Sequence, residues 1–188
     1  MARPRSEDRE HRILAAAAIL VAQHGVGAAT AQIAKQAGVP HGSIFTYFET
    51  KAELLNRTYL ALKAELTDAV IEAVATEQVQ QAQLRRLWES WISWGVHYPV
   101  KRRALGQLSV SDQITPETRA ISYAAAKPLV DLIHQVSAGG SLRDLPKPYV
   151  ASLVETMVTI TIEHMSDNPV QAAAISASGF EAMWKALT

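Results

Sequence analysis

Two short amphipathic stretches, separated by Gly38-Val39-Pro40, constrain the fold of this chain more than any other feature of its sequence. The first stretch reads TAQIAKQA, and its apolar residues have helical spacing. The glycine can adopt the left-handed conformation that closes a helix, while the proline suits the first turn of the next one. That next helix, from about His41 to Phe48, has only two turns. It therefore needs neighbouring helices, which Ile44 and Phe48 would contact from one face.

Apolar residues recur at helical spacing along almost the whole chain, and no segment alternates with period two. The expected fold is all-α with about nine helices. Their expected ranges are about 6–25, 30–38, 41–48, 51–75, 80–98, 100–108, 116–137, 147–165 and 169–186. Thr30 is the expected N-cap of the second helix, and Gly25 and Gly27 are expected to supply the positive φ angles that end the first.

Two short helices joined by a tight glycine-containing turn have the geometry of a helix-turn-helix, whose second helix enters a DNA major groove. The free face of that helix would carry His41, Gly42, Ser43, Phe45 and Thr46. Hydroxyl, imidazole and aromatic groups can reach base edges or thymine methyls there. Lys51, at the start of the following helix, is placed to bind a phosphate and so to fix the register in which bases are read.

The formal net charge is zero, but the charges are unevenly distributed. Residues 1–63 contain eight Lys/Arg and five Asp/Glu, and the remainder has ten Lys/Arg and thirteen Asp/Glu. A basic N-terminal part permits a polyanionic partner without requiring one. The sequence has no cysteine, no secretory signal and no apolar run of about 18 residues, which predicts a cytoplasmic protein without a membrane partner.

Residues 30–55, TAQIAKQAGVPHGSIFTYFETKAELL, resemble the TetR family of bacterial transcriptional regulators. The family pattern has a threonine, IA, AGV, a helix start with small residues, an aromatic-x-Tyr-Phe run, then a lysine and a leucine pair. Upstream, RILAAAAILVAQHGVGAAT resembles the family's first helix and the bend after it. The similarity covers about the first 60 residues. It implies a three-helix DNA-binding domain over residues 1–50 and a helical effector-binding and dimerisation domain over residues 51–188.

The resemblance also implies roles for single residues. Thr30 and Gln32 would lie near the DNA backbone, and Tyr47 and Lys51 would contact phosphates, while the residues that face bases would be His41, Gly42, Ser43 and Thr46. Phe45 departs from the pattern, because a tyrosine is common at that position. The missing hydroxyl removes a hydrogen bond worth about 1 kcal/mol, yet the ring can still touch a thymine methyl. For Phe45 and Tyr47, packing between helices is the alternative.

Three tryptophans recur every three residues within LRRLWESWISWGVHYP, residues 84–99. On an α-helix Trp88, Trp91 and Trp94 would form a slanted aromatic stripe. One interpretation is core packing. The other is a cavity for a mostly apolar or aromatic small molecule, lined by Trp88, Trp91, Trp94, Tyr98, Tyr123 and His134. The resemblance favours the cavity, because such regulators commonly bind an effector in this domain.

The two C-terminal helices carry a different pattern. Residues 148–165 are apolar nearly all round, and residues 168–187 are rich in small residues that allow close helix approach. One explanation is a larger core. The preferred one is a subunit interface, and the resemblance implies the same symmetric four-helix contact, with Met157, Ile160, Phe180, Met183 and Trp184 as its candidates. A twofold dimer would present two recognition helices about 34 Å apart and bind an approximately palindromic operator in double-stranded DNA.

Catalytic and metal-binding motifs are missing from the sequence. The six histidines include no pair with the spacing of a helical zinc site, and Asp131 with His134 is more often a surface hydrogen bond. No phosphate-binding loop, dinucleotide fingerprint or nucleophile elbow is present. We therefore expect no enzyme and no cofactor, but a ligand-responsive regulator, most simply a homodimeric repressor released by its effector. An activator would show the same features, and a helical protein-interaction module without DNA binding is the alternative.

Overall fold

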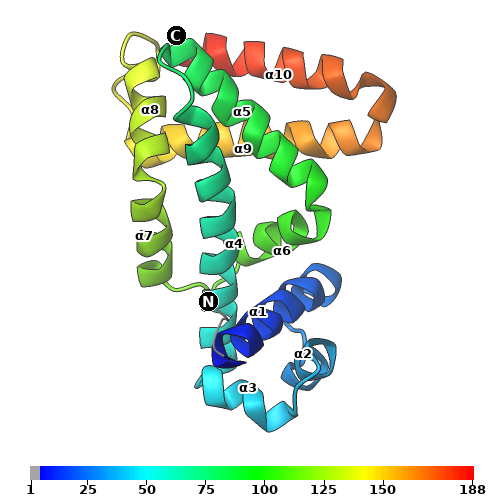
Figure 1. Cartoon of the computed structure of the whole chain (residues 1–188). Helices are drawn as coiled ribbons and strands as arrows, with labels where there is room; N and C mark the ends of the chain where they lie inside the picture. Colours follow the sequence, from blue (N-terminus) through cyan, green and yellow to red (C-terminus); the bar gives the residue numbers. More distant parts are fainter. Residues whose placement is uncertain (1–4) are drawn as a thin grey trace. The chain divides into compact units, whose positions relative to one another are not determined.

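The computed structural model describes residues 5–188, which form ten α-helices, one short 3-10 helix and no strand (Figure 1). This confirms the predicted all-α class. The α-helices are α1 (Arg5–His24), α2 (Thr30–Ala37), α3 (His41–Tyr47), α4 (Lys51–Val74), α5 (Gln80–His97), α6 (Pro99–Ser109), α7 (Pro116–Ala125), α8 (Lys127–Ser137), α9 (Lys147–Asp167) and α10 (Ala172–Leu187). The 3-10 helix η1 (Pro169–Gln171) precedes α10.

The described chain forms two compact units. The first contains residues 5–65 and Tyr98–Tyr123, and so includes α1, α2, α3, the first part of α4, α6 and most of α7. The second contains Leu66–His97 and Ala124–Thr188, with the rest of α4, α5, α8, α9 and α10.

The core of the first unit joins α1, α2, α3 and the start of α4. Its buried members are Ile13, Ala16, Ala17, Leu20, Ala28, Ile33, Ala34, Ala37, Ile44, Phe48 and Leu54. Ile44 and Phe48 are fully buried, which confirms that they fix the short helix α3 to its neighbours. Gly25 and Gly38 end α1 and α2 with φ angles of 77° and 66°, as the sequence predicts for glycines at helix C-termini.

Two local predictions at these helix ends are wrong. Helix α2 begins at Thr30, but the N-cap position is held by Ala29 in an extended conformation, without a side-chain cap. The Thr30 hydroxyl instead makes a hydrogen bond to Nε2 of His41. Gly27 does not take a positive φ angle, because Gly25 alone provides the left-handed residue after α1.

The single helix predicted over residues 116–137 is two helices, α7 and α8, separated at Ala126. Pro128 lacks the N–H that would bond to the carbonyl of Ala124, and its ring would clash with that carbonyl. The first helix therefore ends at Ala125, and the proline occupies the first turn of the second. This break accounts for ten helices in the described residues where about nine were expected.

The second unit is built around α9, against which α5, α8 and α10 pack (Figure 1). Trp88 of α5 lies at the junction with α10, where its Nε1 donates a hydrogen bond to Oγ of Ser176 at 3.3 Å and its ring meets the edge of Phe180. Gly179 makes this approach possible. A Cβ atom at that glycine would lie 2.7 Å from the Trp88 ring and 2.9 Å from Oγ1 of Thr161.

A polar clamp fixes the loop between α6 and α7 to α4 within the first unit. The Asn56 side chain donates to the carbonyl of Gln113 at 2.8 Å and accepts from the backbone N–H of Thr115 at 3.0 Å. Arg119 donates to the carbonyls of Ser109 and Ser111 at 2.7 and 2.8 Å. Asn56 is buried and lies five residues after Lys51, the first residue of α4. It therefore ties this loop to the first two turns of α4, the helix that follows α3.

Candidate nucleic-acid interface

Helix α3 presents a polar face opposite to its buried anchors. His41, Gly42, Phe45 and Thr46 are exposed, and Ser43 is half-buried. Burial of Ile44 and of Phe48, the residue that ends the helix, leaves this face as the only one open to a partner. The structure thus brings together the residues that the sequence predicted to face bases.

The exposed face of α3 is linked to the start of α2 through His41. One ring nitrogen of His41 is 3.0 Å from the Thr30 hydroxyl. The same imidazole meets the Phe45 ring edge-on, with centroids 5.6 Å apart and planes at 73°. Thr30, His41 and Phe45 therefore form a connected row on the surface. Thr30, which is predicted to lie near the DNA backbone, is thus a neighbour of His41, which is predicted to face bases.

Tyr47 takes part in packing as well as in the exposed face. Its side chain is half-buried against the apolar cluster of the first unit, and its ring lies 6.5 Å from that of Phe48. The ring of Tyr47 therefore packs between helices, as the alternative interpretation of this residue expects. The same alternative does not describe Phe45, because 48% of that residue is exposed.

The start of α4 is capped by its own side chains. The Thr50 hydroxyl accepts a hydrogen bond from the N–H of Glu53 at 3.0 Å, and the Glu53 carboxylate accepts one from the N–H of Glu49 at 2.6 Å. This arrangement resembles a capping box. It uses one of the free amides and places a negative charge in the first turn, so a phosphate here would depend mainly on the ammonium group of Lys51. No hydrogen bond or ion pair holds Lys51 within residues 5–188.

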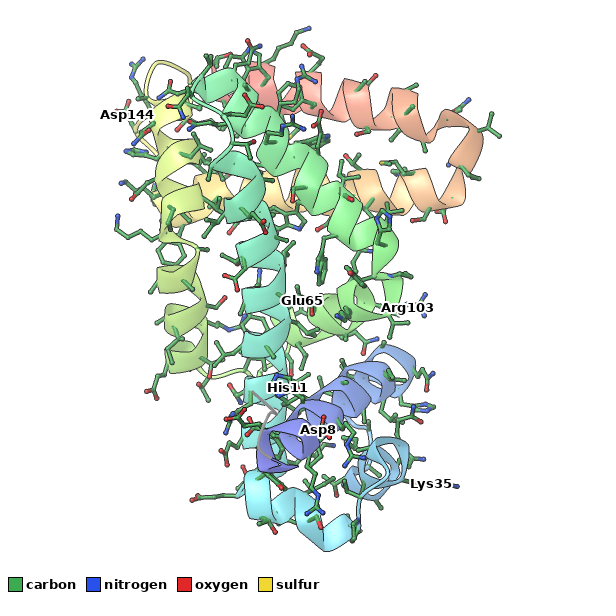
Figure 2. All side chains as sticks on the ribbon, in the orientation of Figure 1. Asp8, His11, Lys35, Glu65, Arg103 and Asp144 are labelled. Atoms are coloured by element: carbon green, nitrogen blue, oxygen red, sulfur yellow. The ribbon has the colours of Figure 1, made fainter. Side chains whose placement is uncertain are left out.

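Lys35 is a candidate that the sequence analysis did not single out. It is exposed on α2 three residues after Gln32, so the two side chains lie on one side of that helix. Figure 2 shows Lys35 extending outward from α2. The signal was present in the sequence as a lysine three residues after Gln32, which is expected near the DNA backbone.

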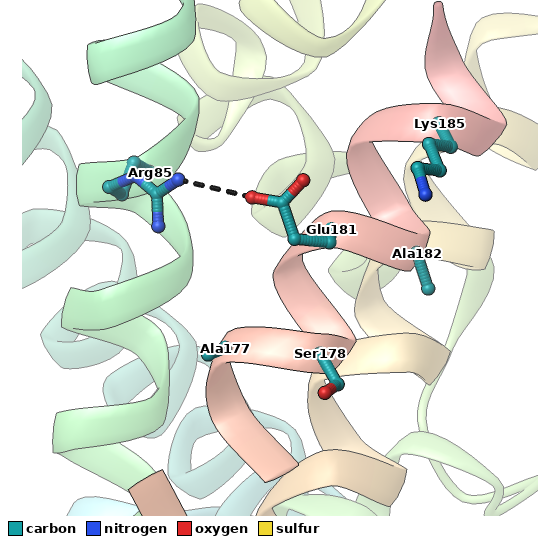
Figure 3. A pocket seen from close by; sticks show the side chains of 6 residues that line it. All are labelled: Arg85, Ala177, Ser178, Glu181, Ala182 and Lys185. Carbon is teal, nitrogen blue, oxygen red and sulfur yellow. Dashed lines mark hydrogen bonds and ion pairs between the residues drawn. The ribbon is translucent and has the colours of Figure 1, made fainter. Parts of the chain in front are cut away.

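The residues predicted to bind an effector are divided between the two units. Trp88 and Trp94 are buried and Trp91 and His134 half-buried in the second unit, whereas Tyr98 and Tyr123 are exposed in the first. Trp88 is engaged with α10. Nδ1 of His134 is buried without a hydrogen-bond partner in the part of the chain described. A surface hollow of about 510 Å³ lies elsewhere, between α5 and α10 (Figure 3). It is lined by Arg85, Ala177, Ser178, Glu181, Ala182 and Lys185.

The residues predicted to form a subunit interface divide into two groups. Ile160 is exposed, and Met157 and Trp184 are half-buried. Phe180 and Met183 are fully buried inside the second unit, where the Arg85 guanidinium lies 3.9 Å from the centre of the Phe180 ring. Those two side chains belong to the core of the unit and have no surface to offer to a second copy.

Residues 13–58 match the family model of bacterial regulatory proteins of the tetR family. The chain belongs to the TetR family. The matched segment extends from α1 through the first two turns of α4, so it includes the whole exposed face of α3 and the lysine that follows it. As a TetR-family protein, the chain is a DNA-binding transcriptional regulator and not an enzyme, and the alternative of an interaction module without DNA binding is set aside.

Solved structures of TetR-family regulators resemble the whole chain. A proposed regulator from Shewanella sp. PV-4 has a TM-score of 0.86 at 24% identity and covers 95% of this chain and 97% of its own. A regulator from Marinobacter aquaeolei VT8 has a TM-score of 0.83 at 26% identity, covering 99% and 98%. The regulator LfrR from Mycobacterium smegmatis, in complex with proflavine, has a TM-score of 0.71 at 19% identity, covering 96% and 98%. The similarity thus includes the C-terminal helices.

No helix within residues 5–188 has the length and apolar character needed to cross a membrane. In the same described part of the chain, no group of three or more His, Asp or Glu side chains is arranged to hold a metal ion.

Proposed function

We propose that this TetR-family protein reads DNA with the exposed face of α3, and that α2 and the start of α4 position that face on the phosphate backbone. In this proposal His41, Gly42, Ser43, Phe45 and Thr46 face base edges. Thr30, Gln32, Tyr47 and Lys51 lie at the backbone, and Lys35 is added to them. The observation that carries the proposal is the burial of Ile44 and Phe48, which holds a two-turn helix in place while its polar side stays open.

The second part of the proposal is a homodimer formed through α9 and α10. The buried stripe of α9, Val150, Val154, Val158 and Ile162, already faces its own unit. A second apolar row, Leu153, Met157 and Ile160, remains partly or largely exposed on the same helix. Exposed apolar rows of this kind mark protein interfaces. Met157 and Ile160, with Trp184 on α10, are therefore the interface residues that we retain.

The third part concerns the effector, for which we propose a small, largely apolar or aromatic molecule. Trp91 and His134 are the best remaining candidates to contact it, because Trp88 is already packed against Ser176 and Phe180. The buried and unpartnered Nδ1 of His134 offers a polar group that such a ligand can satisfy. LfrR, which binds the aromatic compound proflavine, gives a precedent within the family for this class of ligand.

In functional terms residues 1–50 would be the DNA-binding domain, and residues 51–188 the effector-binding and dimerisation domain of a cytoplasmic repressor. The packing of α6 against α1 supports a route between them. Gln107 of α6 donates a hydrogen bond to the carbonyl of Ala22, and the Asn56 clamp ties the loop after α6 to α4. A shift of α6 caused by the effector would then change the orientation of the DNA-binding helices, and release the operator when the two recognition helices no longer match successive grooves.

Selection from a random duplex library tests the DNA-reading face. The wild-type protein should enrich an approximately palindromic sequence with two half-sites. Thr46→Ala should change the preferred bases, whereas Arg103→Ala, an exposed residue of α6, should not. The proposed reading face would be contradicted if no sequence is enriched. It would also be contradicted if Thr46→Ala and variants at His41 and Ser43 all keep the base preference of the wild type.

A matched pair of substitutions tests the dimer. Ile160 on α9 and Ile121 on α7 are each 51% exposed. Ile160→Glu should shift the protein from dimer to monomer in sedimentation velocity, because the charge would be buried at the interface. Ile121→Glu should leave the dimer intact. Equal behaviour of the two variants would reject α9 as the interface.

Tryptophan emission tests the effector site. A compound that releases the operator should quench or shift the emission of the wild type, and Trp91→Phe should abolish most of that change. If the change persists undiminished in Trp91→Phe, the ligand binds away from this residue.

A further inference from the structure

Phe45 is an exposed aromatic ring in the middle of a polar face. It is 48% exposed, although Ile44 beside it and Phe48 at the end of the helix are fully buried. A phenyl ring has no group that can bind a phosphate oxygen, so it gains nothing from the DNA backbone. Exposure of the ring costs free energy that is recovered only when an apolar group covers it.

Neighbouring side chains support this ring. The His41 and Phe45 rings meet edge to face at a centroid distance of 5.6 Å, and a ring nitrogen of His41 lies 3.0 Å from the Thr30 hydroxyl. The backbone beneath the ring is fixed by the buried Ile44. A ring fixed in advance loses little conformational entropy when it meets a partner surface.

The edges of bases in the major groove offer one apolar group, the C5 methyl of thymine. We propose that Phe45 is a specificity-determining residue that packs against a thymine methyl in each half-site of the operator, and that Thr30, through His41, positions its ring. This inference rests on the proposed DNA-reading face of α3.

Thr46 is the competing source of such a contact, because it is exposed beside Phe45 and carries a methyl group of its own. The two side chains can be separated chemically. Thr46→Ser removes only a methyl group, and Phe45→Ala removes only the ring. Since Phe45 is exposed, its removal should not unfold the unit, and a thermal melt followed by circular dichroism checks this point.

The experiment replaces thymine by deoxyuridine, which removes the methyl group and keeps every hydrogen-bonding group of the base. The duplex is the sequence selected with the wild-type protein, and each thymine is replaced symmetrically in both half-sites. At one position the wild type should lose affinity about fourfold per half-site, or about fifteenfold for the two together, as expected for burial of one methyl group each. Phe45→Ala should bind the thymine and deoxyuridine duplexes equally, while Phe45→Leu and Thr46→Ser should keep most of the discrimination.

The role of Thr30 has its own readout. Thr30→Val removes the hydroxyl that holds His41, so the ratio of the affinities for the thymine and deoxyuridine duplexes should fall toward one. Thr30→Ser keeps a hydroxyl and should keep the wild-type ratio. A residue that acted only on stability would change both affinities equally and leave that ratio unchanged, which would overturn the positioning role.

Two results would overturn the role of Phe45. One is a selected duplex in which no thymine is sensitive to loss of its methyl group. The other is Phe45→Ala retaining the wild-type discrimination, in particular if Thr46→Ser loses it. Both results require that the wild type selects a sequence, so they differ from failure of the DNA-reading face itself, in which no sequence would be enriched.

Discussion

Gly179→Ala is expected to destabilise the protein through a collision with Trp88. An added Cβ would lie 2.7 Å from Cζ2 and 3.0 Å from Cη2 of that ring, and 2.9 Å from Oγ1 of Thr161. The ring is 1% exposed and its Nε1 is bonded to Ser176, so it has little room to move. Overpacking of this kind costs about 1–3 kcal/mol. Replacing a helical glycine by alanine returns about 1 kcal/mol, so the net loss in free energy of unfolding should be about 0–2 kcal/mol.

Gly106→Ala is the matched control, because Gly106 also lies inside a helix and an added Cβ there meets nothing within 4 Å. It should stabilise the protein by up to about 1 kcal/mol. The gain from replacing a helical glycine by alanine is common to both variants. The difference of about 1–3 kcal/mol between their free energies of unfolding therefore measures the collision with Trp88. Urea denaturation followed by circular dichroism measures it. If Gly179→Ala is as stable as Gly106→Ala, Trp88 is not wedged in the core, and its assignment as a core residue and not an effector contact fails.

Three further predictions concern the anchors of the fold. Ile44→Ala should lower the free energy of unfolding by about 2–5 kcal/mol in urea denaturation, because the side chain is fully buried under α3; Thr46→Ala, on the exposed side, should have a far smaller effect. Asn56→Ala should cost about 1–3 kcal/mol by leaving the N–H of Thr115 without its acceptor, and amide exchange at residues 113–115 should quicken; unchanged exchange there would show that Asn56 does not hold the loop. Hydrogen bonds from Lys127, then Lys147, hold the pKa of Asp131 below its usual range. Asp131→Asn should therefore be less stable than the wild type at neutral pH, and the difference in melting temperature should vanish as the pH falls through that lowered pKa; a difference that grows in acid would contradict this.

The bounds of α1 to α4 could be predicted closely from the sequence because strong local signals mark the ends of these helices. Gly38 takes the left-handed conformation that its place after α2 indicates, and Ile44 and Phe48 are buried as their spacing requires. The prediction of Thr30 as an N-cap is wrong because its hydroxyl makes a hydrogen bond to His41, eleven residues away. Such a contact depends on tertiary structure, so propensity alone does not predict it.

The second unit was less predictable, because burial in a helical bundle depends on which helix packs against which. Trp88 has the spacing of a cavity-lining stripe, and only the position of Gly179 on α10 shows that its ring is enclosed. Phe180 and Met183 were expected at a subunit interface on their apolar character, which a buried core position satisfies equally well. The break before Pro128 was readable from sequence, since a proline at that position ends the preceding helix.

The salt dependence of operator binding by Lys51→Ala tests the central claim most directly. If Lys51 of each subunit contacts a phosphate through the face formed by α3 and the start of α4, the slope of log K against log salt should fall by about two for the dimer. Arg103→Ala, which removes an exposed charge on α6, should leave the slope as in the wild type. An unchanged slope for Lys51→Ala, or an equal loss for Arg103→Ala, would contradict the assignment of this face to DNA.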